Sequence, residues 1–409
     1  MGERVEPEIR ILESEAELGE AAALFRTAMV ALPSWWELPE GAASRFLEPG
    51  RTWGSFLDGM LVGTVDATSG RLTLPGGARI PHAAVTHVGV LPTHTRRGVV
   101  SGLVRRQLSD ARDRGELVAT LRASEATIYG RFGYGVASTS VSVEVDVRRA
   151  ALRPDVPESG PVRLLTRPDR WEVLAEIHSR HLPSRPGTID RSGYWWNSQR
   201  RRADSITEPM YVVVHGEPGQ ENGFACYRPL DTQRWFTGRT VAVDDFFAPS
   251  PEAHAGLLRF LLGLDLVEKL RFAALPEDDT LALLLRDPRA AEIRSVSDET
   301  WLRILDLERA LAARTWRGSG SVGVEVTDSL FRDNSGTFEI SPDGVRRCSA
   351  GTEADLSVDV ADLGALLLGG VSWQRMAAAG RVRVHRPEAV DTADLLFSWP
   401  CVPFAGTSF

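Results

Sequence analysis

The stretch at residues 86–103, Thr-His-Val-Gly-Val-Leu-Pro-Thr-His-Thr-Arg-Arg-Gly-Val-Val-Ser-Gly-Leu, predicts a strand, an arginine-bearing turn and a helix in succession. The strand ends at Pro92, and apolar residues at 100–108 recur at helical spacing. A loop entering a helix N-terminus directs free backbone N–H groups and the positive end of the helix dipole at one point. The pattern fits an anion site, and it fits equally a plain strand–helix turn with Arg96 and Arg97 in solvent.

Composition and charge narrow the class of protein. With 409 residues the chain is too long for one ordinary core, so we expect two or three domains. A net charge of −8 argues against a nucleic-acid partner and favours small cationic partners. The three cysteines lack metal-ligand spacing, so no metal site is predicted. Because no apolar run approaches bilayer length and the first residues lack a signal core, we expect a cytoplasmic protein without a membrane span.

The residues around the opening stretch predict a mixed domain over residues 1–150. Ser14 begins a capping box ahead of a helix with one apolar face. Strands of a meander are expected at residues 51–65 and 71–80, with hairpin turns at their Asp-Gly and Gly-Gly pairs. Paired tryptophans between prolines, at residues 33–39, fit either core packing or the wall of a ligand pocket.

The rest of the chain predicts two more domains. Residues 160–287 repeat the order strand, proline, helix, strand but lack the basic glycine turn, so we expect a second copy of the fold without the anion site. Residues 298–409 are expected to begin with a helix at 300–314, followed by strands and short helices. The last ten residues contain two prolines and two phenylalanines, and such a stiff apolar end is expected to dock rather than to fray.

Two motifs carry a resemblance to known proteins. The Val-x-Val strand, proline, Arg-Arg-Gly turn, helix and second strand resemble the acetyl-CoA signature of GCN5-related N-acetyltransferases, with departures at Thr95 and Val100. Residues 124–135, Ser-Glu-Ala-Thr-Ile-Tyr-Gly-Arg-Phe-Gly-Tyr-Gly, resemble the signature of the Eis (enhanced intracellular survival) acetyltransferases. The resemblance implies an α+β chain with tandem GCN5-related acetyltransferase folds, the second degenerate. It also implies a C-terminal sterol-carrier-protein-like α/β domain whose C-terminus reaches the active site.

The resemblance further implies an N-acetyltransferase with acetyl-CoA as co-substrate and no metal. A strand edge would pair with the pantetheine arm, the turn and helix start would cradle the pyrophosphate, and the next strand would end where acyl and pantetheine groups meet. In that order, the cofactor-binding residues are Val88, Gly89 and Val90, then Arg96, Arg97, Gly98, Val99, Val100 and Ser101, then Ser124 and Glu125. Trp36 and Phe25 are candidate walls of the acceptor pocket.

Two groups are candidates for the proton transfers. Tyr129 is the candidate general acid, because a phenol with a pKa near 10 stays protonated at neutral pH; from the residues alone it fits a buried core tyrosine equally well. The resemblance implies that the α-carboxylate of Phe409 accepts a proton from the substrate ammonium. A carboxylate is a weak base in water, so burial would have to raise its pKa, or the group would act mainly by orienting the amine.

The resemblance implies small-molecule acceptors with primary amines, either aminoglycosides acetylated at several positions or lysine side chains. It also implies a homohexamer formed by two trimers. The rival reading is a CoA- or lipid-binding module in which the departures at Thr95 and Val100 have ended turnover. Steady thiol release with an amine acceptor is expected for the enzyme, and stoichiometric CoA retention for the binding module.

Overall fold

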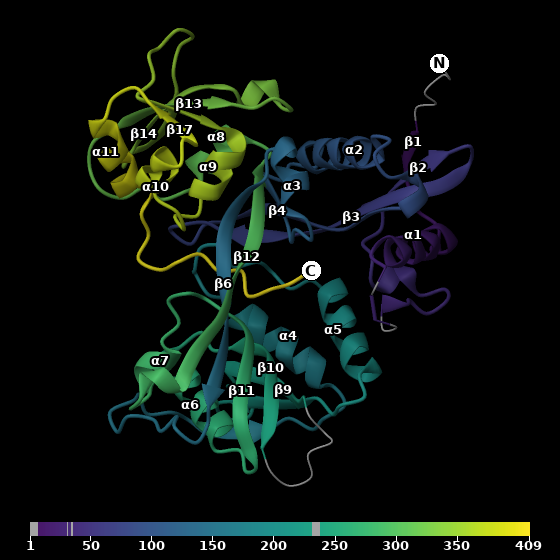
Figure 1. The fold of residues 1–409 in the computed structure, drawn as a ribbon, viewed down its shortest axis with the longest axis vertical. Helices are drawn as coiled ribbons and strands as arrows, with labels where there is room; N and C mark the ends of the chain where they lie inside the picture. Colours follow the sequence, from purple (N-terminus) through teal and green to yellow (C-terminus); the bar gives the residue numbers. More distant parts are fainter. Residues whose placement is uncertain (1–6, 31, 34–35, 231–237) are drawn as a thin grey trace. The chain divides into compact units, whose positions relative to one another are not determined.

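The protein is described by a computed structural model that covers residues 7–30, 32–33, 36–230 and 238–409. It forms two compact units, each assembled from segments that are distant in the sequence (Figure 1). Unit 1 comprises Met1–Ser138, Ser184–Ser198 and Glu299–Phe409, and unit 2 comprises Thr139–Pro183 and Gln199–Asp298. Trp35, one of the paired tryptophans, lies outside the described residues.

The first part of unit 1 is built on a sheet with the strand order β1-β2-β3-β4-β5-β12. The bounds are β1 (Glu8–Ile11), β2 (Trp53–Leu57), β3 (Met60–Thr73), β4 (Arg79–Val90), β5 (Val118–Leu121) and β12 (Ala291–Ile304), which belongs to unit 1 from Glu299 onward. Neighbouring strands are antiparallel except β4 and β5, which are parallel. A parallel pair needs a crossover connection, and helix α2 (Val99–Asp113) supplies it.

Helices cover both faces of this sheet. Successive side chains of a strand point to opposite faces, so neighbouring apolar residues of β3 pack against different helices. Leu61 of β3 packs in a cluster with helix α1 (Glu15–Ala28), whereas its neighbour Val62 packs in a cluster with α2. The two helices therefore lie on opposite faces of the sheet (Figure 1). The capping box predicted at Ser14 is confirmed, since its hydroxyl accepts the Glu17 N–H and its own N–H donates to the Glu17 carboxylate.

The second part of unit 1 has a five-stranded sheet of order β15-β14-β13-β16-β17. Its elements are α8 (Leu307–Ala312), β13 (Val322–Thr327), β14 (Gly336–Ser341), β15 (Gly344–Arg347), β16 (Leu356–Asp359), α9 (Val360–Leu366), α10 (Trp373–Ala378), β17 (Val382–Val384) and α11 (Glu388–Phe397). The interior is filled by large side chains such as Phe338, Trp373 and Phe397, all at most 2% exposed. This domain therefore has a packed hydrophobic core.

One predicted element is wrong. The helix expected at residues 300–314 is strand β12 as far as Ile304, and only the part from Leu307 is helical, as α8. Residues 301–304 pair with the buried strand β5, from Trp301 opposite Leu121 to Ile304 opposite Val118. That pairing is remote in the sequence, and it outweighs the local spacing of apolar residues that suggested a helix.

Unit 2 repeats the strand–helix–strand order. Its strands are β6 (Gly135–Asp146, from Thr139), β11 (Val267–Leu275), β10 (Arg239–Phe247), β9 (Gly223–Pro229), β8 (Tyr211–His215) and β7 (Val162–Leu164), in that order in the sheet. Its helices are α4 (Arg170–Arg180), α6 (Pro251–Leu262), α7 (Leu281–Leu284) and the end of α5 (Gly193–Ser205). Strands β10 and β11 are parallel and joined by α6, whose first turn is capped by the Ser250 hydroxyl, as the sequence predicts.

Among the described residues, no helix combines the length and the apolar character that crossing a bilayer requires.

Candidate active site

The arginine-bearing loop has the features of an anion cradle. Gly98 precedes α2 with a φ of 89°, a left-handed conformation that favours glycine, and Arg96 also has a positive φ of 63°. No side chain caps α2 within the described residues, and its first turn contains no acidic residue. Arg96 and Arg97 are exposed beside these free N–H groups. The loop can therefore hold a pyrophosphate through backbone donors and two guanidinium groups.

Strands β4 and β5 separate beside this loop. Their pairing covers only residues 82–84 of β4 with 118–120 of β5, although β4 continues to Val90. In the described residues, the later part of β4 has no strand partner on its β5 side. The backbone groups of Val88, Gly89 and Val90 at that edge are thus available to an extended ligand such as a pantetheine arm.

A β-bulge in β4 lies at the point of separation. Thr64 of β3 pairs with Gly89 and Asp66 pairs with Thr86, so two residues of β4 oppose one of β3. One of the two is His87, whose φ of 49° is unusual for a residue other than glycine. Bulges redirect side chains and occur often beside active sites.

Tyr129 ends the short helix α3 (Ala126–Tyr129), which follows β5. Its side chain is buried, with an exposed fraction of 5%, and its ring lies edge-on to Tyr134 with the centroids 6.0 Å apart. Burial and, second, the negative charge of Glu125 raise the pKa of Tyr129 to about 12. The phenol is therefore protonated at neutral pH, as a proton donor must be. Ser124 and Glu125 precede the helix and are exposed.

The glycines of the 124–135 motif are explained by packing after Tyr129. Gly133 has a φ of 85°, and a methyl group on it would collide with the buried guanidinium of Arg303. A methyl group on Gly135 would collide with the carbonyl of Ala361 in α9. The turn that carries Tyr129 is thus held between β12 and the C-terminal domain, and only glycine permits this close approach.

The C-terminal segment is docked along its length, as predicted. The buried carboxylate of Glu299 accepts the N–H groups of Ala405 and Gly406 at 3.0 and 3.1 Å. Arg191 donates to the carbonyl of Gly406 at 2.6 Å, and the indole N–H of Trp195 donates to the carbonyl of Ser408 at 2.6 Å. These bonds fix the backbone immediately before the last residue.

The last residue lies at the C-terminal end of β5. Arg122, the residue after β5, donates to the carbonyl of Thr407, and its guanidinium carbon lies 5.4 Å from the centroid of the Phe409 ring. His82 of β4 meets the same ring edge-on, with the centroids 6.4 Å apart. The Phe409 ring therefore lies against a side chain of β4 and against Arg122, the residue that follows β5. Arg122 precedes Tyr129 by seven residues in the sequence. Within the described residues, no hydrogen bond joins the Tyr129 hydroxyl to the Phe409 carboxylate.

The two predicted pocket walls meet at the bulge. The rings of Phe25 and Trp36 are 5.7 Å apart, and each contacts the imidazole of His87, at 4.9 and 5.4 Å. Gly89 allows α1 this close, because a methyl group there would lie 3.2 Å from the side chains of Phe25 and Ala28. The three rings form one wall beside the edge of β4.

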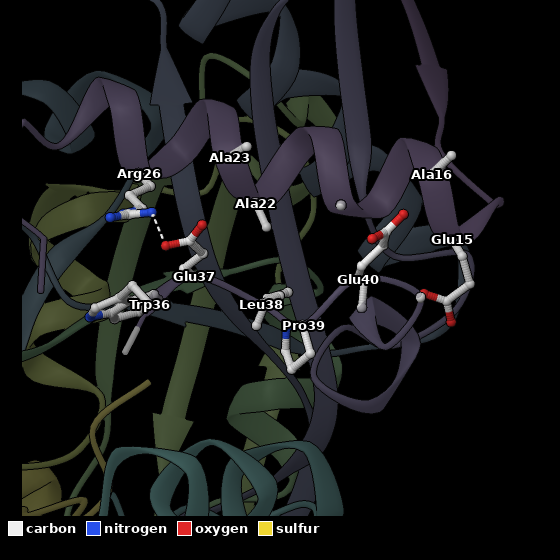
Figure 2. A pocket seen from close by; sticks show the side chains of 13 residues that line it. Glu15, Ala16, Ala22, Ala23, Arg26, Trp36, Glu37, Leu38, Pro39 and Glu40 are labelled. Atoms are coloured by element: carbon white, nitrogen blue, oxygen red, sulfur yellow. Dashed lines mark hydrogen bonds and ion pairs between the residues drawn. The ribbon is translucent and has the colours of Figure 1, made fainter. Parts of the chain in front are cut away.

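A pocket of about 580 Å³ opens beside Trp36, between α1 and the segment 36–43 (Figure 2). It contains three carboxylates, from Glu15, Glu37 and Glu40. Figure 2 shows the Glu37 carboxylate turned toward Arg26, with which it forms an ion pair at 2.8 Å. The sequence did not identify these acids, because their approach depends on how the segment folds back over the helix.

The sequence also missed the side chains that hold the C-terminal segment. Arg122, Arg191, Trp195 and Glu299 come from three separate stretches, and no spacing rule connects them. Their one sequence signal is that Arg122 directly follows a buried strand, where a charged side chain commonly marks a site.

Comparisons with known proteins agree with this architecture. A model of the acetyltransferase (GNAT) domain matches residues 8–137, a second such model matches residues 187–304, and a sterol carrier protein domain matches residues 307–405. The predicted order of two acetyltransferase folds and a sterol-carrier-like domain is confirmed. The chain is 34% identical to an uncharacterized N-acetyltransferase of Streptomyces avermitilis over 395 residues, or 94% of both chains.

Further comparisons are with a named enzyme and with two solved structures. The chain is 32% identical to the N-acetyltransferase Eis of Mycobacterium tuberculosis, over 80% of this chain and 81% of that one. It is 45% identical to Eis1 from Mycobacterium abscessus, whose crystal structure aligns with a TM-score of 0.91 over 98% of this chain and 100% of that chain. A GCN5-related N-acetyltransferase from Anabaena variabilis, 19% identical, shares the fold with a TM-score of 0.84 over 98% and 100% of the two chains. The chain therefore belongs to the Eis family of N-acetyltransferases within the GCN5-related superfamily.

Proposed function

We propose that the protein transfers the acetyl group of acetyl-CoA to primary amines of small polycationic acceptors, aminoglycosides above all, and also to lysine side chains. The observation that carries this proposal is the separation of β4 and β5: the arginine loop before α2 follows β4, and the docked C-terminal segment is bonded to Arg122, which follows β5. The carboxylates of the neighbouring pocket favour a cationic acceptor. A cytoplasmic homohexamer is part of the same proposal, by analogy with the family.

Different groups of the cofactor-binding residues would bind different parts of acetyl-CoA. The N–H groups at the start of α2, with Arg96, Arg97 and Gly98, would hold the pyrophosphate. The edge of β4 at Val88–Val90 would pair with the pantetheine arm, with Ser124 and Glu125 opposite at the end of β5. The remaining cradle residues, Val99, Val100 and Ser101, supply the first-turn N–H groups.

Two groups would handle protons. The amine nitrogen forms the amide bond as the carbon–sulfur bond breaks, and the departing thiolate needs a proton, which Tyr129 supplies. The raised pKa keeps this phenol protonated until the thiolate appears. The Phe409 carboxylate would attract and orient the substrate ammonium, and it would accept a proton from it directly or through water.

The proposal is tested by mixing the purified protein with acetyl-CoA and an aminoglycoside that bears several primary amines. Steady release of free thiol and a product carrying two or more added acetyl groups by mass spectrometry are expected. A peptide with one free lysine serves as the second acceptor. Stoichiometric retention of CoA without product would identify a CoA-binding module instead and would contradict the proposed activity.

Glu299→Ala is expected to lower turnover by roughly tenfold while acetyl-CoA affinity stays unchanged. The change leaves the buried N–H of Ala405 and the partly buried N–H of Gly406 without an acceptor, and a buried donor left unpaired costs about 1–3 kcal/mol. It also removes the partner of the Ser138 hydroxyl and the ion pair with Arg122. The segment should then detach, which faster removal of Phe409 by a carboxypeptidase would detect.

The matched control for Glu299 is Glu308→Ala, which removes an exposed carboxylate of the same domain that pairs with Arg347 at the surface. It should leave both turnover and carboxypeptidase resistance unchanged. A Glu299→Ala protein with wild-type turnover and a detached tail would show that the C-terminus has no part in the reaction.

A further inference from the structure

A histidine and a buried aspartate form a hydrogen-bonded pair at the bulge of β4. The carboxylate of Asp66 is 1% exposed, and its Oδ2 lies 3.3 Å from Nδ1 of His87. Its other oxygen accepts the hydroxyl of Thr52 at 3.0 Å. Because an ionised carboxylate only accepts hydrogen bonds, Nδ1 carries the proton and Nε2 keeps a free lone pair. This is the tautomer that a proton acceptor at Nε2 requires.

The backbone is strained in order to present this side chain. His87 has a φ of 49° inside the bulge, and a residue other than glycine pays about 1–2 kcal/mol for a left-handed conformation. A histidine that only filled space in the sheet would have no need of this conformation or of a buried carboxylate as partner. The strained backbone and the buried carboxylate together hold the imidazole in one position at the bulge.

The imidazole is partly exposed. Its side chain is 22% exposed, and Nε2 has no hydrogen-bond partner among the described residues. The rings of Phe25 and Trp36 both contact it, and Trp36 also lines the acidic pocket. The other histidine of β4, His82, is fully buried and bonded to Thr120, so it cannot exchange protons with a substrate.

We propose that His87 is a catalytic residue that accepts the proton of the acceptor ammonium at Nε2, and that Asp66 is its positioning residue. This inference rests on the proposed N-acetyltransferase activity and adds a second proton acceptor to it. One ammonium proton passes to Nε2, and the freed amine attacks the thioester carbonyl. The C–N bond forms and the C–S bond breaks, the thiolate takes a proton from Tyr129, and the second nitrogen proton restores Tyr129. The proton on His87 is released to solvent.

Imidazole is better matched to this task than a terminal carboxylate. A general base works best when its pKa lies near the working pH, and the ordinary values are about 6.5 for imidazole and about 3.5 for an α-carboxyl group. His87 therefore takes the larger share of proton removal, beside the Phe409 carboxylate, which attracts and orients the ammonium and is the other proton acceptor. Both groups border β4, Phe409 at His82 and His87 at the bulge.

The groups that face His87 come from β3, from the residue before β2, from α1 and from the segment 36–43. The charged group in contact with His87 is the carboxylate of Asp66 on β3, which also accepts the hydroxyl of the uncharged Thr52. The rings of Phe25, on α1, and of Trp36, in the segment 36–43, contact the imidazole as well. Arg26 and Glu37, which form an ion pair, line the pocket together with Trp36. Because a protonated imidazole cannot accept a proton, kcat/KM should be lower at acidic than at neutral pH, and this difference should disappear when the imidazole is removed.

The test compares His87→Gln and His87→Phe with the wild type over the pH range 5–9, using acetyl-CoA and an aminoglycoside. We expect kcat/KM at neutral pH to fall by about 10²-fold in both variants. We expect the acidic limb to vanish, and acetyl-CoA affinity by calorimetry to stay unchanged. His87→Phe keeps an aromatic ring in the wall and so separates packing from proton transfer. His385→Gln, an exposed histidine of the C-terminal domain, is the control that should behave as wild type.

A readout apart from activity is the ¹⁵N spectrum of the histidine side chains. The proton of neutral His87 should reside on Nδ1 in the wild type and move to Nε2 in Asp66→Asn, whose amide donates to Nδ1. Wild-type kcat/KM with an intact acidic limb in His87→Phe would overturn the inference and leave the acetyltransferase proposal standing. If the wild type acetylates no amine, the proposed acetyltransferase activity is wrong. A proton on Nε2 of neutral His87 in the wild type would overturn the inference about His87 by itself.

Discussion

Tyr129→Phe is expected to lower kcat by about 10²–10⁴-fold with little change in acetyl-CoA affinity, because a positioned general acid typically contributes that factor. The ring is buried between β-sheet and turn, and phenylalanine keeps its shape. Only the hydroxyl proton that the thiolate needs is lost. Stopped-time assays of thiol release, with calorimetric titration of acetyl-CoA as the affinity measurement, separate the two quantities.

The neighbouring Tyr134 supplies a matched control. Its ring contacts that of Tyr129 edge-on, and its hydroxyl is buried without a hydrogen-bond partner among the described residues. Tyr134→Phe removes an unsatisfied polar group, so it should leave kcat unchanged and stability equal or slightly higher. Equal losses of kcat in the two variants would mean that ring packing, and not proton donation, accounts for the effect of Tyr129.

The pKa of Tyr129 also limits what its titration can explain. Burial and the charge of Glu125 favour the neutral phenol and raise the pKa to about 12, so the proton donor is fully present at every pH below about 11. A loss of activity on the alkaline side below that pH therefore has another cause. On the acidic side Tyr129 does not titrate, so a loss of activity there also has another cause.

Local sequence rules predicted the parts of the site that lie close together in the chain. The strand, arginine turn and helix of residues 86–103 form as predicted, because turn chemistry, a left-handed glycine at Gly98 and helical spacing all act over a few residues. The same holds for the caps at Ser14 and Ser250. Docking of the last residues was also predicted, from the stiffness of an apolar segment with two prolines.

Contacts between residues that are distant in the sequence could not be predicted from such local rules. Asp66 and His87 are brought together by the register of β3 on β4, and the pairing shifts at a bulge that no local pattern announces. Glu299 and Arg122 reach the C-terminal segment because β12 pairs with β5, and the apolar spacing at 300–304 suggested a helix. A wrong assignment for β12 thus also concealed the anchor of the C-terminus.

Asp328→Ala is expected to lower the free energy of unfolding by about 3–5 kcal/mol, because it leaves the guanidinium of Arg303 buried without its counter-charge. The two side chains are 1% and 0% exposed, and both carboxylate oxygens accept the same guanidinium nitrogen, at 2.8 and 2.6 Å. Asp328 also accepts the N–H groups of Leu330 and Phe331. Calorimetric scans should show a lower unfolding temperature for the domain that contains it.

The surface pair of Asp333 with Arg112 is the control, since Asp333 is 66% exposed and Asp333→Ala should change stability by less than about 1 kcal/mol.

A second comparison isolates the effect of the unpaired guanidinium of Arg303: Arg303→Met combined with Asp328→Ala should be more stable than Asp328→Ala alone. Because Arg303 packs against Gly133 in the turn after Tyr129, partial unfolding here should reduce turnover as well. If Asp328→Ala and the double variant melt together, lost backbone hydrogen bonds, and not the unpaired guanidinium, determine the stability of this turn.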